Sequence, residues 1–386
     1  MSGIFIDASH FAQADHLCEI ISSRKLVVTA AKNIAADALG GTLVFSAAQE
    51  KAMGGHQGLI AFARSLKPKL VTIIDPKANR FAIEPSLGGK VIHISLPSDD
   101  FFALTVAADL ICADLSNMIA ADPETSNLLS LASRVAKSDV TVFINGPTGT
   151  GKEVLARFIH DKSARHTAPF VAINCAAIPE NMLEAVLFGH EKGAFTGASV
   201  ANKGIFRAAN LGTLLLDEIS EMPIGLQSKI LRVLQERKVT PLGAQTEIDV
   251  DVRVLATTNR DMRAEIQKNN FREDLFYRLN VFPMATQSLS DRALDILPIA
   301  VALLRKHAPS LEMIPWLSES ARDALLDHSW PGNVRELQNM IERAAILATG
   351  GKLRFRFHEK DATRPHSSWP SASSGRSSRF SRNRLR

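Results

Sequence analysis

Cysteine is scarce in this chain, and long apolar runs are missing. The three cysteines, Cys18, Cys112 and Cys175, are widely spaced, which fits neither a metal-binding pattern nor a disulfide framework. No apolar run approaches the ~18 residues that a membrane-spanning helix needs. The first residues, MSGIFIDASHFAQADH, lack the basic start and apolar stretch of a secretory signal peptide. We therefore expect a cytoplasmic protein without membrane contact.

The apolar content is sufficient for buried cores. Of the 386 residues, 46% are hydrophobic and 22% are charged, which allows two or three globular domains. The net charge of +5 is unevenly placed, because residues 360–386 contain seven Lys or Arg and one acid, a net of +6. The rest of the chain therefore sums to −1, and its charge does not indicate nucleic-acid binding.

Four zones follow from the pattern of apolar runs. Residues 1–117 alternate short apolar runs (LVVTAA, TLVFSA, LVTIID, VIHISL) with helix-like stretches, which is typical of a small α/β regulatory domain with a mainly parallel sheet. Residues 118–284 form a larger α/β region, and residues 285–357 a helical one. Residues 358–386 are rich in Ser, Arg and Pro, and we expect disorder there because so few apolar residues cannot form a core.

A glycine-rich turn marks the larger α/β region. The stretch VTVFINGPTGTGKEVLARFIH combines a buried-strand pattern, a turn of the form GxxxxGK and an amphipathic helix. Glycines let the backbone wrap closely around phosphates, whose charge the helix N-terminus favours, and the lysine would reach the β- and γ-phosphates. The full motif places Ser or Thr after the lysine, where this chain has Glu153, so an ordinary strand-to-helix turn is the alternative. The residues expected at the nucleotide are Gly146, Gly149, Thr150, Gly151, Lys152 and Glu153.

Two adjacent acids follow a second buried-strand pattern. LGTLLLDEIS places Asp217 and Glu218 directly after a run of apolar residues. Ligands of open α/β sheets bind at the carboxyl ends of the strands. We therefore expect Asp217 to hold Mg²⁺ and Glu218 to polarise a water molecule that attacks ATP. Two solvated acids at a surface strand end are the alternative.

The run Gly193-Ala194-Phe195-Thr196-Gly197-Ala198 fits neither a helix nor a strand. Glycines flank an aromatic ring and a β-branched hydroxyl, which predicts a flexible loop with an exposed apolar tip.

Six blocks together resemble one known family. GPTGTGKE, NCAAIPENMLEAVLFGHEKGAFTGA, GTLLLDEIS, LQSKILRVLQE, FREDLFYRLNVFP and WPGNVRELQNMIERA have the order and spacings of the AAA+ domain of the sigma-54-dependent transcriptional activators, the bacterial enhancer-binding proteins. The resemblance covers residues 118 to about 350. A glutamate after the P-loop lysine is also usual in that family, and the overall pattern is similar to its flagellar regulators.

The resemblance implies both a fold and an activity. The fold would be an AAA+ P-loop ATPase, a parallel sheet flanked by helices with a C-terminal helical lid, preceded by a small receiver-like α/β domain. The activity would be hydrolysis of ATP, with Mg²⁺, in a homo-oligomeric ring that is a hexamer in this family. Hydrolysis would remodel RNA polymerase bound to sigma-54 and permit promoter opening, with loop 193–198 contacting sigma-54.

Further roles carry over by position. Asn174 matches the asparagine that holds the catalytic glutamate, here Glu218, and releases it according to the nucleotide state. Thr258 and Asn259 match sensor I at the end of another buried strand. Capping of a turn by Asn174 is the simpler alternative.

Three arginines also match the family. Arg272 and Arg278 correspond to arginine fingers offered to the γ-phosphate of the neighbouring subunit, which suits a permanently charged, forked guanidinium. Arg335 corresponds to sensor II at the start of a lid helix. Acids near Arg272 and Arg278 leave surface salt bridges as their alternative role.

Two substitutions depart from the family pattern. Ser290 replaces the first arginine of a segment that usually reads PLRER, and Leu211 replaces a usual glycine before the Asp-Glu strand. We expect the change at Leu211 to be a silent difference in packing.

The N-terminal zone lacks the residues of a competent receiver. A receiver needs an acidic pair after its first strand, an acceptor Asp after its third and a Lys after its fifth. This chain offers Asp7, then Asp75, and no convincing lysine. We therefore expect regulation by a protein partner or through ring assembly, without phosphorylation of Asp75.

The C-terminal end also departs from the family. No helix-turn-helix pattern follows residue 357, so sequence-specific DNA binding is not expected. A natural variant without that domain and a reading-frame change both account for the Ser/Arg-rich tail, which would bind phosphates non-specifically or remain solvated. The alternative function is a nucleotide-binding ring subunit that lacks DNA anchoring and modulates full-length relatives.

Overall fold

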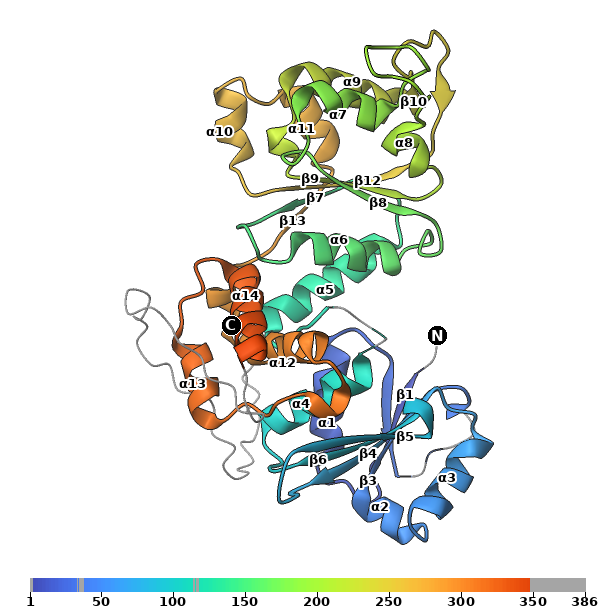
Figure 1. The fold of residues 1–386 in the computed structure, drawn as a ribbon, viewed down its shortest axis with the longest axis vertical. Coiled ribbons are helices and arrows are strands. Elements are labelled where there is room, and N and C mark those ends of the chain that lie inside the picture. The colour runs from blue at the N-terminus through green and yellow to red at the C-terminus, as the bar shows by residue number, and fades with distance from the viewer. Residues whose placement is uncertain (1–2, 33, 35–37, 114, 116–117, 348–386) are drawn as a thin grey trace, which may run out of the picture.

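The structure is a computed structural model that describes residues 3–32, 34, 38–113, 115 and 118–347. Two α/β units occupy opposite ends of the molecule, and the last described helices lie between them (Figure 1). The predicted tail, 358–386, and residues 348–357 of the predicted lid lie outside the described residues. In the described part of the chain, no helix is both long and apolar enough to cross a bilayer.

The first unit runs in chain order through β1 (Ile4–Asp7), α1 (Ala14–Ser23), β2 (Val28–Ala31), β3 (Thr42–Ser46), α2 (Ala47–Ala52), α3 (His56–Ser65), β4 (Leu70–Pro76), β5 (Ala82–Ser86), β6 (Val91–Leu96) and α4 (Phe101–Cys112). The strands form one sheet in the order β2-β1-β3-β4-β6-β5, parallel except for β5. Alternate residues of a strand point to opposite sides of the sheet, and apolar residues on both sides are covered by helices. Leu43 and Phe45 of β3 belong to the core with α3, whereas Val44 packs with α1 and α4.

The predicted receiver-like topology has a serine where a receiver has its acceptor. The third strand in chain order, β3, ends at Ser46, whose hydroxyl donates to the main-chain oxygen of His10 and accepts from the N–H of Gln49. Asp75 lies on β4, and β3 separates β4 from the strand that carries Asp7. This arrangement agrees with the expectation that Asp75 is not a phosphoryl acceptor, which stays a prediction.

The second unit runs through α5 (Pro123–Ala136), β7 (Val142–Asn145), α6 (Lys152–Asp161), β8 (Phe170–Asn174), α7 (Glu180–Phe188), α8 (Gly204–Ala208), β9 (Thr213–Asp217), α9 (Ile224–Glu236), β10 (Lys238–Val239), β11 (Ile248–Asp249), β12 (Arg253–Thr258), α10 (Met262–Gln267), α11 (Glu273–Leu279) and β13 (Phe282–Ala285). Five strands form a wholly parallel sheet in the order β13-β7-β12-β9-β8. Leu214 and Leu216 of β9 pack with α7, α9 and α11, and Leu215 packs on the other face with α5 and α6.

The last described segment is helical: α12 (Ile296–His307), α13 (Glu319–Asp327) and α14 (Asn333–Leu347). These helices share one hydrophobic core with α1 and α4 of the first unit. The ring centroids of Phe102 on α4 and Trp316, which precedes α13, are 4.9 Å apart. The lid is therefore packed against the N-terminal unit.

A buried ion pair crosses the contact between the lid and the N-terminal unit. Asp109 on α4 is 2% exposed, and its carboxylate accepts from Nε of Arg305 on α12 at 2.7 Å. The other carboxylate oxygen lies 3.4 Å from Nη1 of Arg24, which is also buried. An unpaired carboxylate would be costly at such a depth. Arg305 pairs with it across the contact, and Arg24 pairs with it within the N-terminal unit.

The expectation for Leu211 was wrong in its physical basis. Leu211 has φ of +64° and is 63% exposed, so the position demands a left-handed backbone rather than a particular packing. Glycine adopts this conformation without strain, whereas an L side chain meets the neighbouring carbonyl. Leucine here carries backbone strain that a family glycine avoids.

Candidate active site

The glycine-rich turn between β7 and α6 is closely packed against neighbouring backbone. Gly146 has φ of +156°, and a Cβ there would lie 2.1 Å from Oγ1 of Thr286. Gly149 has φ of +79°, and a Cβ there would lie 2.5 Å from the carbonyl oxygen of Gly332. Only glycine fits both positions. The turn is therefore closely packed at these two glycines, and Gly149 lies against the lid.

Helix α6 begins at the predicted lysine. Gly151 is its N-cap in the left-handed region, and Lys152 is 6% exposed. Nζ of Lys152 donates to the main-chain oxygens of Gly146 at 2.9 Å and Pro147 at 3.2 Å. Burial lowers the pKa of Lys152, and the charges of Glu218 and Asp217 partly oppose that shift. Glu153 is exposed on the first turn of α6.

The hydroxyl of Thr150 points into the loop. Its Oγ1 donates to the main-chain oxygen of Pro147 at 2.8 Å and lies 2.7 Å from Oγ1 of Thr286. The hydroxyl therefore helps to shape the turn, and Thr286 fastens it to the end of β13.

The carboxyl ends of β8, β9 and β12 meet at one edge of the sheet. Register pairs Asn174 directly with Asp217, and Nδ2 of Asn174 donates to Oδ2 of Asp217 at 2.9 Å. Oδ1 of Asp217 accepts from the hydroxyl of Thr257 on β12. Two neighbouring strands thus fix the orientation of this carboxylate.

Asn174 contacts a different acid from the one we expected. The family resemblance implies that Asn174 holds Glu218. In the structure its amide binds Asp217 instead, because Asn174 and Asp217 face each other in the ladder. Glu218 is one residue beyond the strand with φ of +51°, and this backbone conformation turns its side chain away. Oε1 of Glu218 lies 3.8 Å from Nζ of Lys152.

Glu218 is held in an unusual position for a glutamate. A left-handed glutamate costs on the order of 1 kcal/mol. Its N–H donates to Oγ1 of Thr257 at 3.2 Å, which helps to hold this backbone conformation. Oε2 of Glu218 is buried and has no hydrogen-bond partner among the described residues. A buried acceptor without a donor is a place for a polar ligand.

Thr257 is a site residue that the sequence analysis missed. It lies next to the predicted sensor residues in VLATTN, and it supports Asp217 and Glu218 at once. Of the predicted pair, Thr258 donates to the hydroxyl of Ser220 at 2.9 Å, and Asn259 donates from Nδ2 to Oγ1 of Thr148 at 2.8 Å. Asn259 therefore contacts the phosphate loop directly.

The lid reaches the same loop through the residues before and at the start of α14. Asn333 is buried, donates from Nδ2 to the main-chain oxygen of Thr148 at 3.0 Å, and accepts from the N–H of Leu289 at 2.7 Å. The N–H of Val334 donates to the oxygen of Gly149 at 2.9 Å. The predicted Arg335 lines an open pocket with Pro147 and Thr148, and its charge contributes to lowering the pKa of Lys152.

A second lid contact comes from the segment that departs from the family pattern. Arg292 is 7% exposed and donates from Nη2 to the main-chain oxygen of Thr150 at 2.6 Å. Its Nη1 lies 3.6 Å from Asp295, which is fully buried and accepts from the N–H groups of Ala121 and Asp122. Burial raises the pKa of Asp295 above its ordinary value. Ser290, which replaces an arginine, bonds to the hydroxyl of Ser288 at 2.6 Å.

A cavity of about 250 Å³ lies beside the phosphate loop. Its lining is mostly apolar and comes from α5, α6 and the chain after β13: Met118, Thr125, Leu128, Leu155, Thr286 and Arg292 are among its residues. A flat apolar group attached to a phosphate chain would have room here.

The two predicted arginine fingers lie on or beside α11. Arg272 is the N-cap residue and forks onto Asp274, with Nε–Oδ1 at 3.0 Å and Nη2–Oδ2 at 2.7 Å. This pairing raises the pKa of Arg272 above its ordinary value and lowers the pKa of Asp274 below its ordinary value. Arg278 donates from Nη2 to the main-chain oxygen of Leu234 at 2.8 Å. The structure does not bring either arginine to the phosphate loop of its own chain in any described contact.

Loop 193–198 connects α7 to α8. Its ends are closed by a hydrogen bond from the N–H of Gly193 to the oxygen of Ala198 at 2.8 Å. Gly193 and Gly197 have φ of +82° and +101°, and a Cβ at either would meet no described atom within 4 Å. Phe195 is 45% exposed, and its ring centroid lies 4.9 Å from that of His190. The predicted exposed apolar tip is present in this geometry.

Two family descriptions match the chain. The Sigma-54 interaction domain matches residues 118–285, and the AAA+ ATPase lid domain matches residues 290–373. The chain is 49% identical over 318 residues to the response regulator protein FleR of Pseudomonas aeruginosa, covering 80% of this chain and 67% of FleR. It is 42% identical over 302 residues to the transcriptional regulatory protein FlbD of Caulobacter vibrioides, covering 77% of this chain and 66% of FlbD.

A solved structure has the same architecture along most of the chain. NtrX from Brucella abortus in complex with ATP aligns with a TM-score of 0.57 and 26% identity, covering 94% of this chain and 87% of that chain. NtrX in complex with ADP aligns with the same TM-score. The matches to FleR and FlbD span about two thirds of those relatives' own lengths.

Proposed function

The chain belongs to the sigma-54-dependent transcriptional activators, whose Sigma-54 interaction domain is an AAA+ ATPase, and from this premise we propose a specific mode of action. The protein binds and hydrolyses ATP in a homo-oligomeric ring in the cytoplasm, most simply a hexamer. Hydrolysis moves loop 193–198, which engages sigma-54 and remodels its RNA polymerase so that the promoter opens.

One observation carries the proposal. The loop that would contact sigma-54 is inserted in the connection between β8 and β9, and the ends of those two strands are joined by the Asn174–Asp217 hydrogen bond. A change at the phosphates that alters this bond therefore acts on the end of β8, from which the chain runs to the loop, and on Asp217 at the far end of β9. The left-handed glycines at 193 and 197 supply the freedom that such a movement requires.

The chemistry of hydrolysis is assigned to three side chains. Lys152 stabilises the charge that develops on the β- and γ-phosphates, and its place at the first residue of α6 puts it at the positive end of that helix. Glu218 accepts a hydrogen bond from the attacking water, and its unpartnered Oε2 is the atom assigned to this role. Asn174 and Thr257 orient Asp217, and Thr257 also holds the backbone of Glu218.

The residues at this edge fit Mg²⁺ bound with the nucleotide. Mg²⁺ prefers carboxylate, phosphate and water oxygens, and each oxygen of Asp217 accepts one described hydrogen bond, which leaves further lone pairs on both. Asp217 would hold the ion, since Glu153 stands where a P-loop hydroxyl usually binds it. The ion would neutralise phosphate charge.

The other nucleotide contacts are shared between the domains. The cavity of about 250 Å³ would take the base, Asn259 and Thr258 would report the γ-phosphate at the end of β12, and Arg335 would reach the phosphates from the lid. Arg272 and Arg278 would act on the nucleotide of a neighbouring subunit. Their described partners lie on α9 and α11, away from the phosphate loop, which is consistent with that arrangement.

A steady-state ATPase assay tests the enzymatic part. Glu218→Gln keeps the size of the side chain but removes the base, and we expect turnover to fall by at least about a hundredfold while ATP still binds. Lys152→Ala should lose binding as well. Wild-type turnover no greater than that of Glu218→Gln would overturn the enzyme assignment in favour of a nucleotide-binding regulatory subunit.

A second assay tests the loop. Thr196→Ala removes only a hydroxyl and a methyl from the exposed tip, so ATPase turnover should stay within about twofold. Open-complex formation by sigma-54 RNA polymerase should be abolished, because the proposal assigns the sigma-54 contact to this tip. Thr196→Ser is the matched control that retains the hydroxyl. Full transcription activation by both Thr196→Ala and Phe195→Ala would refute the role assigned to the loop.

A further inference from the structure

Three potential metal ligands converge in the N-terminal unit, far along the chain from the nucleotide site. Glu50 lies on α2, His56 is the first residue of α3, and His93 is in the middle of β6. Nδ1 of His56 is 3.0 Å from Oε1 of Glu50, and Nε2 of His93 is 3.2 Å from Oε2 of the same carboxylate. One ligand atom of each residue lies within 4.8 Å of those of the other two.

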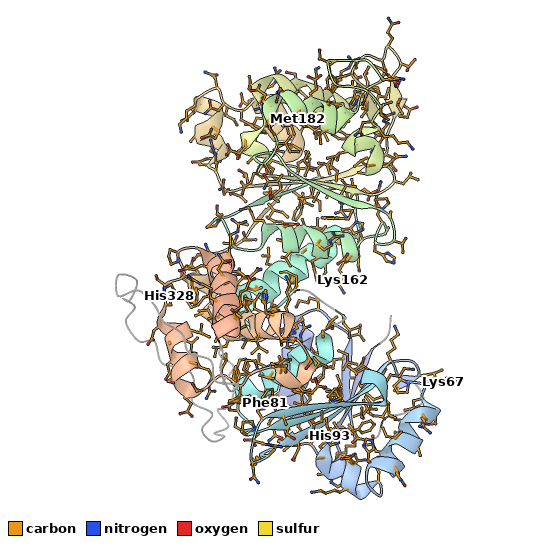
Figure 2. The ribbon with its side chains drawn as sticks, viewed as in Figure 1. Lys67, Phe81, His93, Lys162, Met182 and His328 are labelled. Carbon is orange, nitrogen blue, oxygen red and sulfur yellow. The ribbon has the colours of Figure 1, made fainter. Side chains whose placement is uncertain are left out.

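The three side chains share one face of the first sheet. Val91, two residues before His93 on β6, packs in the core with α3, which places His93 on the α2 and α3 side of the sheet. Figure 2 shows His93 at the boundary between the sheet and these helices. The site is thus built from three separate elements of one folded unit.

We propose that Glu50, His56 and His93 bind a divalent transition-metal ion of the zinc class. Zinc takes imidazole nitrogen and carboxylate oxygen at 2.0–2.2 Å, and in a tetrahedral site neighbouring ligand atoms are then about 3.3 Å apart. The distances of 3.0 and 3.2 Å from the carboxylate to the two rings already approach that spacing. Small rotations of the side chains complete the arrangement.

The ligand set selects the class of ion. Two imidazoles with one carboxylate suit zinc, cobalt or nickel, whereas Ca²⁺ and Mg²⁺ prefer oxygen ligands throughout. The side chain of His56 is 48% exposed, and those of His93 and Glu50 are 29% and 13% exposed. A hydrated ion can therefore reach the site, and three protein ligands leave one position for water.

Metal binding would connect the turn between α2 and α3 to the sheet. α2 and α3 are joined through Gly54 and Gly55, which have φ of +85° and +82° and where a Cβ would meet no described atom within 4 Å. His56 follows this turn immediately. An ion held by Glu50, His56 and His93 would fix the start of α3 to both α2 and the sheet, so it would stabilise the N-terminal unit.

The test uses the full chain stripped of metal by a chelator. Zn²⁺ is titrated in competition with a chromophoric chelator, and Co²⁺ is added separately because its visible spectrum distinguishes tetrahedral from octahedral coordination. We expect one tight equivalent of Zn²⁺, a tetrahedral Co²⁺ spectrum and a higher melting temperature with metal.

Matched variants assign the ion to these residues. His93→Ala and Glu50→Gln should each weaken binding of that equivalent by more than about tenfold, since loss of even an indirect ligand contact has such an effect. His16→Ala, an exposed histidine on α1, is the control and should bind as wild type. His56→Ala serves as an exposed replacement variant if His93→Ala fails to fold.

Two results would overturn the proposal. The first is a Zn²⁺ affinity in Glu50→Gln and His56→Ala equal to that of His16→Ala. The second is Co²⁺ bound only in octahedral form. The first would show that the three side chains form a hydrogen-bonded Glu–His cluster without a metal, and the second would show that the bound ion lacks the tetrahedral coordination of a zinc site.

Discussion

Asn333 of the lid donates its side-chain amide to the main-chain oxygen of Thr148 in the phosphate loop, 3.0 Å away. The same side chain accepts from the N–H of Leu289, and its backbone has φ of +55°, a region that asparagine tolerates better than most residues. Asn333 is buried, so its hydrogen bond joins the lid to the phosphate loop away from solvent.

Replacing Asn333 by Asp should weaken ATP binding. The carboxylate keeps the acceptor for Leu289 but loses the donor to Thr148, at a cost of about 1–3 kcal/mol for the unsatisfied buried group. We expect roughly a tenfold rise in the Kd for a fluorescent ATP analogue. Asn339→Asp, on the same helix beside the open pocket, is the control; equal affinities for the two variants would contradict the assigned contact.

Replacing Thr257 by Val should slow hydrolysis with little change in nucleotide affinity. The hydroxyl supports Asp217 and holds the N–H of Glu218, so its loss misplaces the acids without removing a phosphate contact. A hydrogen bond to a charged group contributes about 1.5–3 kcal/mol, which corresponds to a fall in kcat of tenfold or more. Thr257→Ser should retain activity, and comparable kcat values for Val and Ser would count against the role.

Mixing two inactive variants tests whether the arginines act between subunits. Lys152→Ala lacks nucleotide binding but retains Arg278, whereas Arg278→Ala binds nucleotide but lacks the arginine. An equimolar mixture should regain about a quarter of wild-type ATPase turnover. In randomly assembled rings, about a quarter of the interfaces join the intact phosphate loop of an Arg278→Ala subunit to the intact Arg278 of a Lys152→Ala neighbour. A mixture of Lys152→Ala with Glu218→Gln should stay inactive. No regain in the first mixture would exclude action of Arg278 in trans, and equal regain in both mixtures would show that the recovery is not specific to the arginine.

Replacing Leu211 by Gly should stabilise the protein. Relief of the left-handed backbone yields about 1–2 kcal/mol, of which roughly 0.5–1 kcal/mol is lost to the greater freedom of glycine in the unfolded chain. We expect a rise of about 0.5 kcal/mol or more in the free energy of unfolding, measured by urea denaturation. Leu39→Gly, at a similarly exposed leucine without positive φ, should be destabilising. Destabilisation at both positions would show that strain at Leu211 is negligible.

Only one of the three cysteines should react with a maleimide in the native protein. Burial raises the pKa of Cys112 to about 11 and that of Cys175 to about 12, so both thiols stay protonated near pH 7 as well as inaccessible. Cys18 is partly exposed. Mass spectrometry should find one adduct in native protein, none in Cys18→Ser, and three after denaturation. A second rapid adduct in the native state would contradict the packing around α4 or β8.

The sequence predicted the chemical core of the site because its motifs are local. A glycine-rich turn before a helix, and acids after a buried strand, imply their own positions, and parallel strands bring those ends to one edge. Comparison with known proteins confirmed the AAA+ fold, the helical lid and the family. The assigned roles of individual site residues stay predictions.

What the sequence did not predict depends on register and on contacts between distant segments. The partner of Asn174 follows from which residue it faces in the ladder, and Thr257 acts on acids carried by another strand. Asn333 and Arg292 reach the phosphate loop from the lid, which no local pattern reveals. The positive φ of Leu211 gives the reason why the family usually has glycine at this position, and no sequence pattern predicts that angle.

The lid has two attachments that belong to different parts of the molecule. Arg305 binds Asp109 of the N-terminal unit, and Asn333 binds the loop that holds the phosphates. Thermodynamic linkage then imposes a reciprocity. If ATP and a ligand of the N-terminal unit each bind differently in two lid positions, each changes the affinity of the other by the same factor. The size of that factor can be measured from either end.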